Sequence, residues 1–298
     1  MASTPFRLGA YFPHTEIEPD AIAIRDFAQA VEGMGYRYLA TADHVIGANR
    51  ASRPDWWGPY DSESLFHEPI VLFAYLAGLT KLEFVTSIII APQRQTVLLA
   101  RQAANLDIFC QGRLRLGVAT GWNQVEYQSL GAPWERRGER LDDQIRVLRR
   151  LWTEQNVIEH TEFHTIDDAG IAPLPIQRPI PIWIGGNKAP ALRRAARLGD
   201  RWMPFLKLDE KARVAEFRDA VAAAGRDPAR IGIDNIVHLG SAGLGPVRTV
   251  EAVAADVAAW SEAGLDSMCI YTMAAGLQGL DAHVGAFRRV AEMTGIKA

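Results

Sequence analysis

Short apolar runs alternate with segments of helical periodicity along the chain. In residues 20–34, apolar side chains recur every three or four positions after the helix-start signal Pro19-Asp20. The run at 84–90 is short and rich in β-branched residues, which predicts a strand buried on both faces. These two patterns repeat through the rest of the sequence.

Eight strands are predicted, and a helix is predicted after each of them. The strands are expected at 7–12, 36–42, 84–90, 113–119, 180–184, 201–205, 231–239 and 267–271. The helices are expected at 20–34, 72–79, 97–109, 137–152, 190–198, 210–224, 249–263 and 282–293.

This alternation predicts an α/β fold, a (β/α)8 TIM barrel that forms one domain over residues 1–298. Strands separated by helices pair in parallel with right-handed crossovers, and eight such units close into a barrel. A doubly wound sheet is the alternative, but its glycine-rich phosphate turn is missing. The first strand runs into Phe12-Pro13-His14, and no GxGxxG, P-loop or GxSxG motif follows any predicted strand.

Two segments interrupt the alternation. Residues 47–68, after the second strand, have no periodicity but contain Trp56 and Trp57. Long insertions of this kind are usually lids or partner surfaces, and a packed Ω-loop or a dimer contact is the other interpretation. Residues 156–176 predict a small hairpin and a proline-spaced linker between the fourth and fifth units.

Composition narrows the class of protein. The chain is 48% hydrophobic and 22% charged, with a formal net charge of −3, which is typical of a globular protein and not of a nucleic-acid binder. Its apolar runs are too short for a membrane span, and its first residues lack the features of a signal peptide. Cys110 and Cys269 lie far apart in apolar runs and are interpreted as buried thiols in a reducing compartment. We therefore expect a cytoplasmic enzyme that acts on a small molecule, without nucleic-acid or membrane partners.

In barrel enzymes the chemistry lies on the loops at the carboxyl ends of the strands. Asp43 and His44 follow the second predicted strand, and histidine titrates near neutral pH, so this pair is the best candidate for proton chemistry. Asp43 alternatively caps a turn.

Glycines follow the fifth predicted strand. Gly185-Gly186-Asn187 stands between that strand and a helix start, where free backbone N–H groups suit a phosphate; the alternative is a plain tight turn. The other strand-end candidates are Ser87, Ile88, Thr120, Gly121, Trp122, Asn123, His238 and Tyr271.

Other patterns are not expected to carry chemistry. His160 and His164 are four residues apart, but their surroundings alternate like a strand and no third ligand follows at a useful spacing, so we predict no metal site. Trp183 lies inside a strand and is expected in the core. Three arginines of the helix at 190–198 are expected to form a solvated face: Arg193, Arg194 and Arg197.

Several longer segments resemble the bacterial luciferase-like family. They are LGVATGWNQVEYQSLGAPWERRGERLDDQIRVLRRLW, the ADH that ends in His44, PQRQTVLLARQAANLD, and PIPIWIGGNKAPALRRAARLGDRW. More narrowly, they resemble the branch of oxidoreductases that use 8-hydroxy-5-deazaflavin, coenzyme F-420. The resemblance spans roughly residues 6–205, and its GWNxxEYxxLG segment separates deazaflavin users from FMN users only weakly.

The resemblance implies a flavin-like ring in the mouth of the barrel. Ser87 and Ile88 match a bulge, often with a non-prolyl cis peptide, that supports the reacting ring, and Asp43 and His44 match a pair beside the hydride-transfer centre. The positions matching the cofactor's polar side chain and phosphate are Thr120, Gly121, Asn123, Gly185, Gly186 and Asn187.

At two positions this chain has different residues from the sugar-phosphate dehydrogenases of this branch. Where those enzymes have a tryptophan and a glutamate, this chain has Ala48 and Trp122, so a sugar phosphate is not the expected substrate. Trp56, Trp57 and Trp122 suggest an aromatic, apolar substrate pocket instead.

The expected function is hydride transfer between reduced deazaflavin and a small, apolar or aromatic organic substrate, with His44 handling the accompanying proton. One alternative is an FMN-dependent two-component monooxygenase that uses O₂ and a partner flavin reductase. A second is a non-catalytic flavin-binding barrel. The resemblance also implies a homodimer formed through the helices predicted at 72–79 and 97–109.

Overall fold

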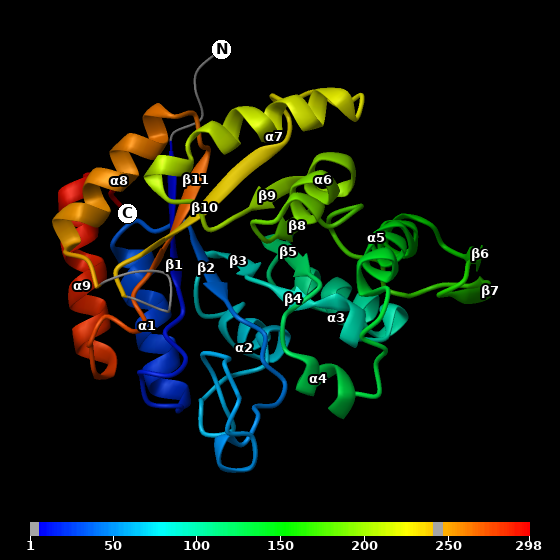
Figure 1. Cartoon of the computed structure of the whole chain (residues 1–298), viewed down its shortest axis with the longest axis horizontal. Helices are drawn as coiled ribbons and strands as arrows, with labels where there is room; N and C mark the ends of the chain where they lie inside the picture. The colour runs from blue at the N-terminus through cyan, green and yellow to red at the C-terminus, as the bar shows by residue number, and fades with distance from the viewer. Residues whose placement is uncertain (1–5, 241–246) are drawn as a thin grey trace.

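Parallel strands close into a barrel in the computed structural model, which describes residues 6–240 and 247–298. Residues 1–5, part of the N-terminal segment that lacks signal-peptide features, lie outside the described part. The strands are β1 (Arg7–Tyr11), β2 (Tyr38–Thr41), β3 (Glu83–Thr86), β4 (Ile89–Ile90), β5 (Leu114–Ala119), β8 (Ile182–Gly185), β9 (Arg201–Met203), β10 (Gly232–His238) and β11 (Ser267–Tyr271). Their order is β3-β2-β1-β11-β10-β9-β8-β5-β4, and pairing of β3 with β5 closes the ring (Figure 1). The predicted (β/α)8 barrel is confirmed.

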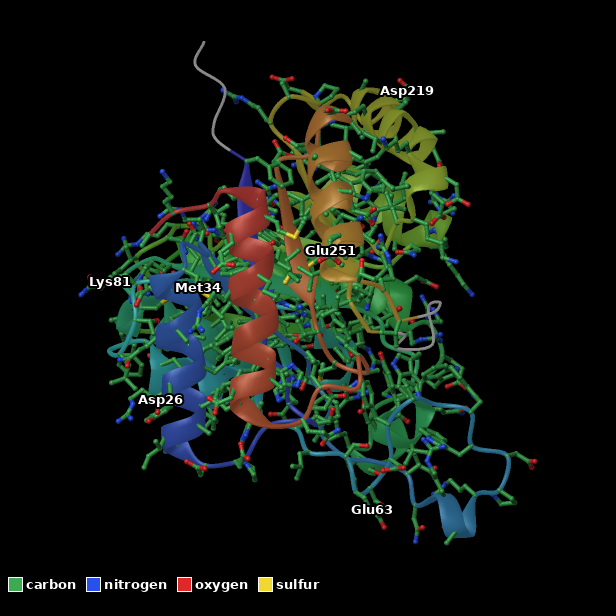
Figure 2. The ribbon with its side chains drawn as sticks, turned by 90° about the vertical axis from the view of Figure 1, so that its left-hand side faces the viewer. Asp26, Met34, Glu63, Lys81, Asp219 and Glu251 are labelled. Atoms are coloured by element: carbon green, nitrogen blue, oxygen red, sulfur yellow. The ribbon has the colours of Figure 1, made fainter. Side chains whose placement is uncertain are left out.

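Helices surround the strands on all sides (Figure 1). They are α1 (Ala21–Gly33), α2 (Pro69–Leu76), α3 (Thr96–Phe109), α4 (Gln124–Ser129), α5 (Arg137–Thr153), α6 (Ala189–Leu198), α7 (Ala212–Ala223), α8 (Val250–Glu262) and α9 (Gly279–Thr294). Figure 2 shows α1, α9 and α8 side by side over one side of the barrel. In the described part of the chain, no helix is both long and apolar enough to cross a membrane.

Three local features differ from the prediction. The third strand is divided into β3 and β4, because the ladder is interrupted at Ser87 and Ile88, whose connecting peptide bond is cis, as the resemblance implied. Helix α2 begins at Pro69 instead of residue 72, because the Glu68 side chain accepts a hydrogen bond from the Val71 N–H and caps it. Helix α4 was not predicted, since six residues are too few to show a period.

The two interruptions are present where they were predicted. Residues 47–68 form an irregular loop with one 3₁₀ turn, Arg50–Ser52, which extends below the barrel in Figure 1. The predicted hairpin consists of β6 (Val157–His160) and β7 (Thr165–Ala169), at the right-hand edge of the same view.

Two apolar layers result from the alternation of side chains along each strand. Met268 and Ile270 of β11 belong to the large cluster between strands and helices, while Cys269 and Tyr271 belong to a smaller cluster inside the barrel. Trp183 also lies in this inner cluster, as predicted. Both cysteines are buried free thiols, as predicted.

The close approach of β3 to β5 depends on Gly117. A Cβ atom at this position would lie 1.9 Å from the carbonyl oxygen of Thr86, so Gly117→Ala is expected to lower the free energy of unfolding by about 3 kcal/mol. Urea denaturation measures the loss. In the control Gly33→Ala, a Cβ at the end of α1 meets nothing within 4 Å, and we expect unchanged or slightly higher stability. Equal stability of the two variants would show that β3 and β5 do not approach each other this closely at Gly117.

Candidate active site

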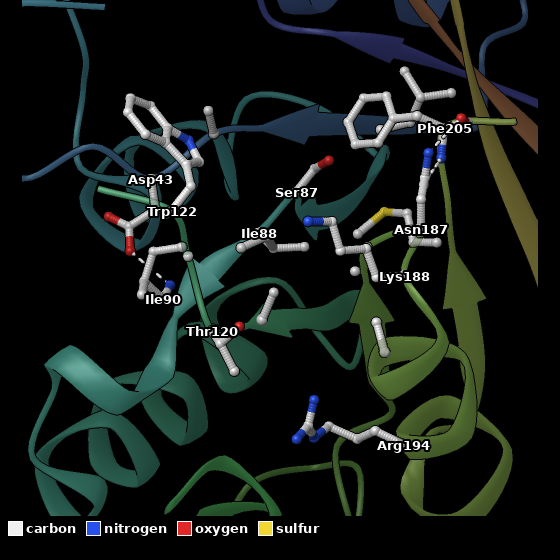
Figure 3. A pocket seen from close by; sticks show the side chains of 18 of the residues that line it. Asp43, Ser87, Ile88, Ile90, Thr120, Trp122, Asn187, Lys188, Arg194 and Phe205 are labelled. Atoms are coloured by element: carbon white, nitrogen blue, oxygen red, sulfur yellow. Dashed lines mark hydrogen bonds between the residues drawn. The ribbon is translucent and has the colours of Figure 1, made fainter. Parts of the chain in front are cut away.

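A cavity of about 760 Å³ opens at the carboxyl ends of the barrel strands (Figure 3). It is lined by residues at or just after the carboxyl ends of β1, β2, β3, β5, β8, β9, β10 and β11. Most of the strand-end candidates predicted from the sequence meet in its wall: Asp43, His44, Ser87, Ile88, Thr120, Gly121, Trp122, Gly185, Gly186, Asn187, His238 and Tyr271.

Asp43 anchors the wall of this cavity. Its carboxylate accepts hydrogen bonds from the Arg94 guanidinium, at 2.7 Å, and from the backbone N–H of Ile90, at 3.1 Å. The side chain is buried, so both oxygens are committed to protein donors. Asp43 therefore joins the end of β2 to β4 and to the start of α3.

His44 forms a pair with a residue that the sequence analysis missed. Its Nδ1 lies 2.9 Å from Oε1 of Glu126, and the other carboxylate oxygen accepts a hydrogen bond from Nε2 of Gln93 at 3.0 Å. Because an ionised carboxylate only accepts, the proton of neutral His44 is placed on Nδ1 and Nε2 remains available to a bound molecule. The acid in the GWNQVEY segment was the signal that could have identified Glu126.

The floor of the cavity is formed around Ile88, whose side chain projects into its centre in Figure 3. The hydroxyl of Tyr11 donates a hydrogen bond to the carbonyl oxygen of Ser87 at 2.9 Å and holds the bulge in place. A Cβ at Gly185 would lie 2.8 Å from the Ile88 side chain. Gly185 thus allows the β8 turn to approach the bulge closely.

One end of the cavity is basic. The turn after β8 leads into α6, and the side chain of Asn187 is fastened to the backbone of Phe205 by two hydrogen bonds, of 2.6 and 2.7 Å. Lys188 precedes α6 and points into the cavity (Figure 3). The N-terminus of α5 reaches the same place with Arg136 and Arg137.

The prediction of a solvated arginine face was wrong for Arg194. Its side chain is only 11% exposed, pairs with Asp142 and donates to the carbonyl oxygen of Gly138 at 3.0 Å. The reason is that α6 packs against α5, so this side of the helix faces the cavity. Arg193 and Arg197 are exposed, as predicted.

The opposite end of the cavity is aromatic and uncharged. Tyr11 and Tyr271 lie 4.8 Å apart between ring centroids, and the hydroxyl groups of Tyr60 and Tyr271 are 3.0 Å apart. Burial raises the pKa of all three tyrosines, so their hydroxyl groups stay protonated at neutral pH. His238 completes this end.

Three predicted site residues lie outside the cavity. Asn123 caps α4 by accepting a hydrogen bond from the Val125 N–H at 3.0 Å, and it faces a smaller neighbouring pocket of about 280 Å³. Trp56 and Trp57 pack on the outer side of Trp122, at 5.7 and 5.2 Å between centroids, and Trp57 is 74% exposed.

The insertion reaches the cavity through Tyr60 instead of its tryptophans. No period or motif distinguishes this tyrosine in the sequence. Its position depends on how the irregular loop folds back over β2.

His164 has a structural partner for each ring nitrogen. Nδ1 lies 2.8 Å from Oδ2 of Asp143, and Nε2 lies 2.6 Å from Oγ1 of Thr96. Within residues 6–240 and 247–298, no group of three or more His, Cys, Asp or Glu side chains is arranged to hold a metal ion.

Comparison with known proteins places the chain in a family. The model of the family described as luciferase-like monooxygenase matches residues 2–282, and the chain belongs to this family of oxidoreductases. An uncharacterized protein of Mycobacterium tuberculosis is 33% identical over 198 residues, which cover 64% of this chain and 68% of that protein.

A curated relative with a named activity is the FMNH(2)-dependent dimethylsulfone monooxygenase of Pseudomonas putida. It is 30% identical over 219 residues, which cover 72% of this chain. The match spans 57% of that relative, little more than half of its length.

Solved structures with the same fold include an F420-dependent secondary alcohol dehydrogenase in complex with an F420-acetone adduct. Its TM-score is 0.75 at 15% identity, with 98% of this chain and 99% of that chain covered. A long-chain alkane monooxygenase has a TM-score of 0.76 at 15% identity, with 97% and 91% covered. At these identities the likenesses establish the fold.

Proposed function

We propose that the chain transfers a hydride between 8-hydroxy-5-deazaflavin, coenzyme F-420, and a small, uncharged, apolar or aromatic organic substrate. The observation that carries this proposal is the basic end of the cavity. Two helix N-termini, those of α5 and α6, meet there with Arg136, Arg137 and Lys188. Helix N-termini and cations both favour bound anions.

The extent of this basic end favours the deazaflavin over FMN. The deazaflavin side chain carries a phosphodiester followed by carboxylates, whereas FMN ends in a single phosphate. Lys188 and Arg137 offer contacts to more than one anionic group, while Arg136 is already paired with Glu139 and Glu162, and Arg194 with Asp142. Gly186, with φ of 118°, allows the backbone before α6 to approach such a group.

The centre of the cavity suits a flat ring system. Ile88 forms the floor, and Gly121 and Gly185 border it where a Cβ would lie 2.8 Å from Ile90 and Ile88 respectively. Thr120 borders the same space. We assign these residues to the cofactor, together with the turn formed by Gly185, Gly186 and Asn187.

The bound coenzyme supplies the hydride chemistry, and the chain positions the reactants and moves the proton. Glu126 orients His44 through Nδ1, so that Nε2 gives a proton to the substrate or takes one from it. Tyr60 and Trp122 pack against the imidazole, at 4.9 and 5.8 Å between centroids, and the His44 side chain is only 14% exposed. The hydrogen bonds that Asp43 accepts from Ile90 and Arg94 fix the loop that carries His44 relative to Ile88.

A second candidate function is an FMN-dependent two-component monooxygenase. It is favoured by the relative of Pseudomonas putida, whose name specifies FMNH(2). In that case the cavity holds reduced FMN that a partner flavin reductase delivers, and O₂ is a substrate. A third candidate, a flavin-binding barrel without turnover, is disfavoured by the His44–Glu126 pair.

A fluorescence titration with each coenzyme tests the cofactor. We expect micromolar or tighter binding of the deazaflavin and weaker binding of FMN. Lys188→Gln is expected to weaken deazaflavin binding about tenfold, because a charge-assisted contact is lost. The control Lys81→Gln removes a positive charge outside the cavity lining and should leave affinity unchanged. Tighter binding of FMN would favour the monooxygenase.

The role of the His44–Glu126 pair is tested by turnover and binding together. His44→Ala is expected to lower kcat at least 100-fold and Glu126→Gln about tenfold, while the dissociation constant of the coenzyme changes less than threefold. The control Glu262→Gln, on an exposed residue of α8, should match the wild type. Unchanged kcat in His44→Ala would remove this residue from the mechanism.

We also propose that two copies of the chain associate through α2 and α3. Large apolar side chains are exposed there: Val71, Tyr75, Val97 and Leu98. Exposed apolar surface of this kind is typical of an interface. Light scattering is expected to give a dimer for the wild type, a monomer for Leu98→Arg, and a dimer for the control Ile158→Arg, which changes an exposed residue of β6. A monomeric wild type would contradict the proposal.

A further inference from the structure

The side chain of Gln93 is buried beside the His44–Glu126 pair, and only one end of its amide is hydrogen-bonded. Gln93 ends the 3₁₀ turn Ala91–Gln93, which directly follows β4, and the residue is 7% exposed. Its Nε2 donates a hydrogen bond to Oε2 of Glu126 at 3.0 Å. Its Oε1 is also buried, and no donor meets this oxygen in the part of the chain that the structure describes.

The unpartnered oxygen indicates what orients this amide. An ionised carboxylate only accepts hydrogen bonds, so Gln93 meets Glu126 with its nitrogen and not with its oxygen. Leaving Oε1 buried without a donor costs free energy, and a buried polar group without a partner is an exception that requires a reason. The contacts supply one, because the amide is oriented for Glu126 at the expense of its own hydrogen bonding.

The Glu126 carboxylate depends on this donor. Its side chain is 1% exposed, Oε1 lies 2.9 Å from Nδ1 of His44, and Oε2 is held by Gln93. Within residues 6–240 and 247–298, these are the two hydrogen-bond partners of the carboxylate. A carboxylate removed from water is tolerated only when it is hydrogen-bonded. Without Gln93, Oε2 has no partner, and the carboxylate is no longer held in the orientation that directs Oε1 at His44.

The turn that carries Gln93 is itself fixed on two sides. Gln144 of α5 donates from Nε2 to the backbone carbonyl oxygens of Ala91 and Arg94, at 3.0 and 3.1 Å, on either side of Gln93 along the chain. The Arg94 guanidinium donates to Asp43 at 2.7 Å. The turn is thus tied both to α5 and to the segment after β2, so its glutamine is held at one place.

We propose that Gln93 is a positioning residue for proton transfer by His44. By holding Oε2 of Glu126, it directs Oε1 at Nδ1 of the imidazole. The proton of the neutral ring then stays on Nδ1, and Nε2 is left to exchange a proton with the substrate. This inference rests on the proposed role of His44, but the effect of Gln93 on the imidazole is present in the protein without coenzyme.

The ring nitrogens of His44 report this effect directly. In protein labelled with ¹⁵N-histidine, at about pH 8, where an ordinary imidazole is neutral, the nitrogen shifts show which ring nitrogen carries the proton. The spectrum of His44→Gln identifies the signals. We expect the proton on Nδ1 in the wild type. In Gln93→Met, which has a similar length but no donor, we expect about half of the rings to carry it on Nε2. A ring that stays protonated on Nδ1 in Gln93→Met would overturn the proposal.

Gln177 provides a matched control. It also donates from Nε2 to a buried carboxylate, that of Asp107 at 2.6 Å, but it lies at the amino end of β5, where it also donates to the Leu114 carbonyl oxygen. Gln177→Met is expected to lower stability and to leave the His44 signals as in the wild type. The same change of His44 in both variants would trace it to general loosening of the fold and refute the assignment to Gln93.

Exchanging the acid and the amide provides a rescue. In Glu126→Gln two amides face each other, and neither is compelled to present its oxygen to His44. In the double variant with Gln93→Glu and Glu126→Gln, the carboxylate at position 93 only accepts, so the amide at position 126 turns its nitrogen toward it and its oxygen toward Nδ1. We expect both protonation forms of His44 in Glu126→Gln and a return to Nδ1 in the double variant. Equal spectra of the single and double variants would overturn the proposal.

The coenzyme titration separates this inference from hydride transfer. The described residues that line the cavity include neither Gln93 nor Gln177, so the dissociation constant of the deazaflavin is expected to change by less than about twofold in both methionine variants. If neither coenzyme binds but the protonation of His44 depends on Gln93, the positioning role stands and the cofactor assignment does not. If the deazaflavin binds and His44 is indifferent to Gln93, the reverse holds.

Discussion

The buried carboxylate of Asp43 holds together the part of the barrel from which the site is built. A carboxylate removed from water is tolerated only when it is paired and hydrogen-bonded. Arg94 and the Ile90 N–H meet this requirement, and in doing so they tie β2 to β4 and α3. His44 is the next residue along the chain, and the Ser87-Ile88 bulge directly precedes β4. The position of both therefore depends on this one ion pair.

The cavity has a gradient of polarity. Its basic end arises because α5 and α6 both begin at the carboxyl ends of neighbouring strands, β5 and β8, which brings their N-termini together. Its aromatic end is formed by β1, β10 and β11, on the other side of the ring of strands. An elongated ligand with an anionic tail and a flat ring fits such a gradient in one direction.

The sequence alone was sufficient for the architecture and for the strand-end candidates. Period-two and period-3.6 patterns are local, and a barrel places every strand end on one face, so Asp43, His44 and Gly185 could be selected before any contact was known. It was insufficient where local pattern misleads. Arg194 has the spacing of a solvated helix face, but the packing of α6 on α5 covers it.

What the sequence by itself determined is thus the number and order of the elements and the residues at the strand ends, because these follow from short-range periodicity. Only the tertiary structure decided which of these residues meet. His44 and Glu126 are 82 positions apart, and Arg194 and Gly138 are 56 apart. No local pattern relates such pairs, since they come together only when parallel strands close into a ring and helices pack around it. The surroundings of His238 have the same origin, because they come from two other segments of the chain, those that carry Phe205 and Tyr271.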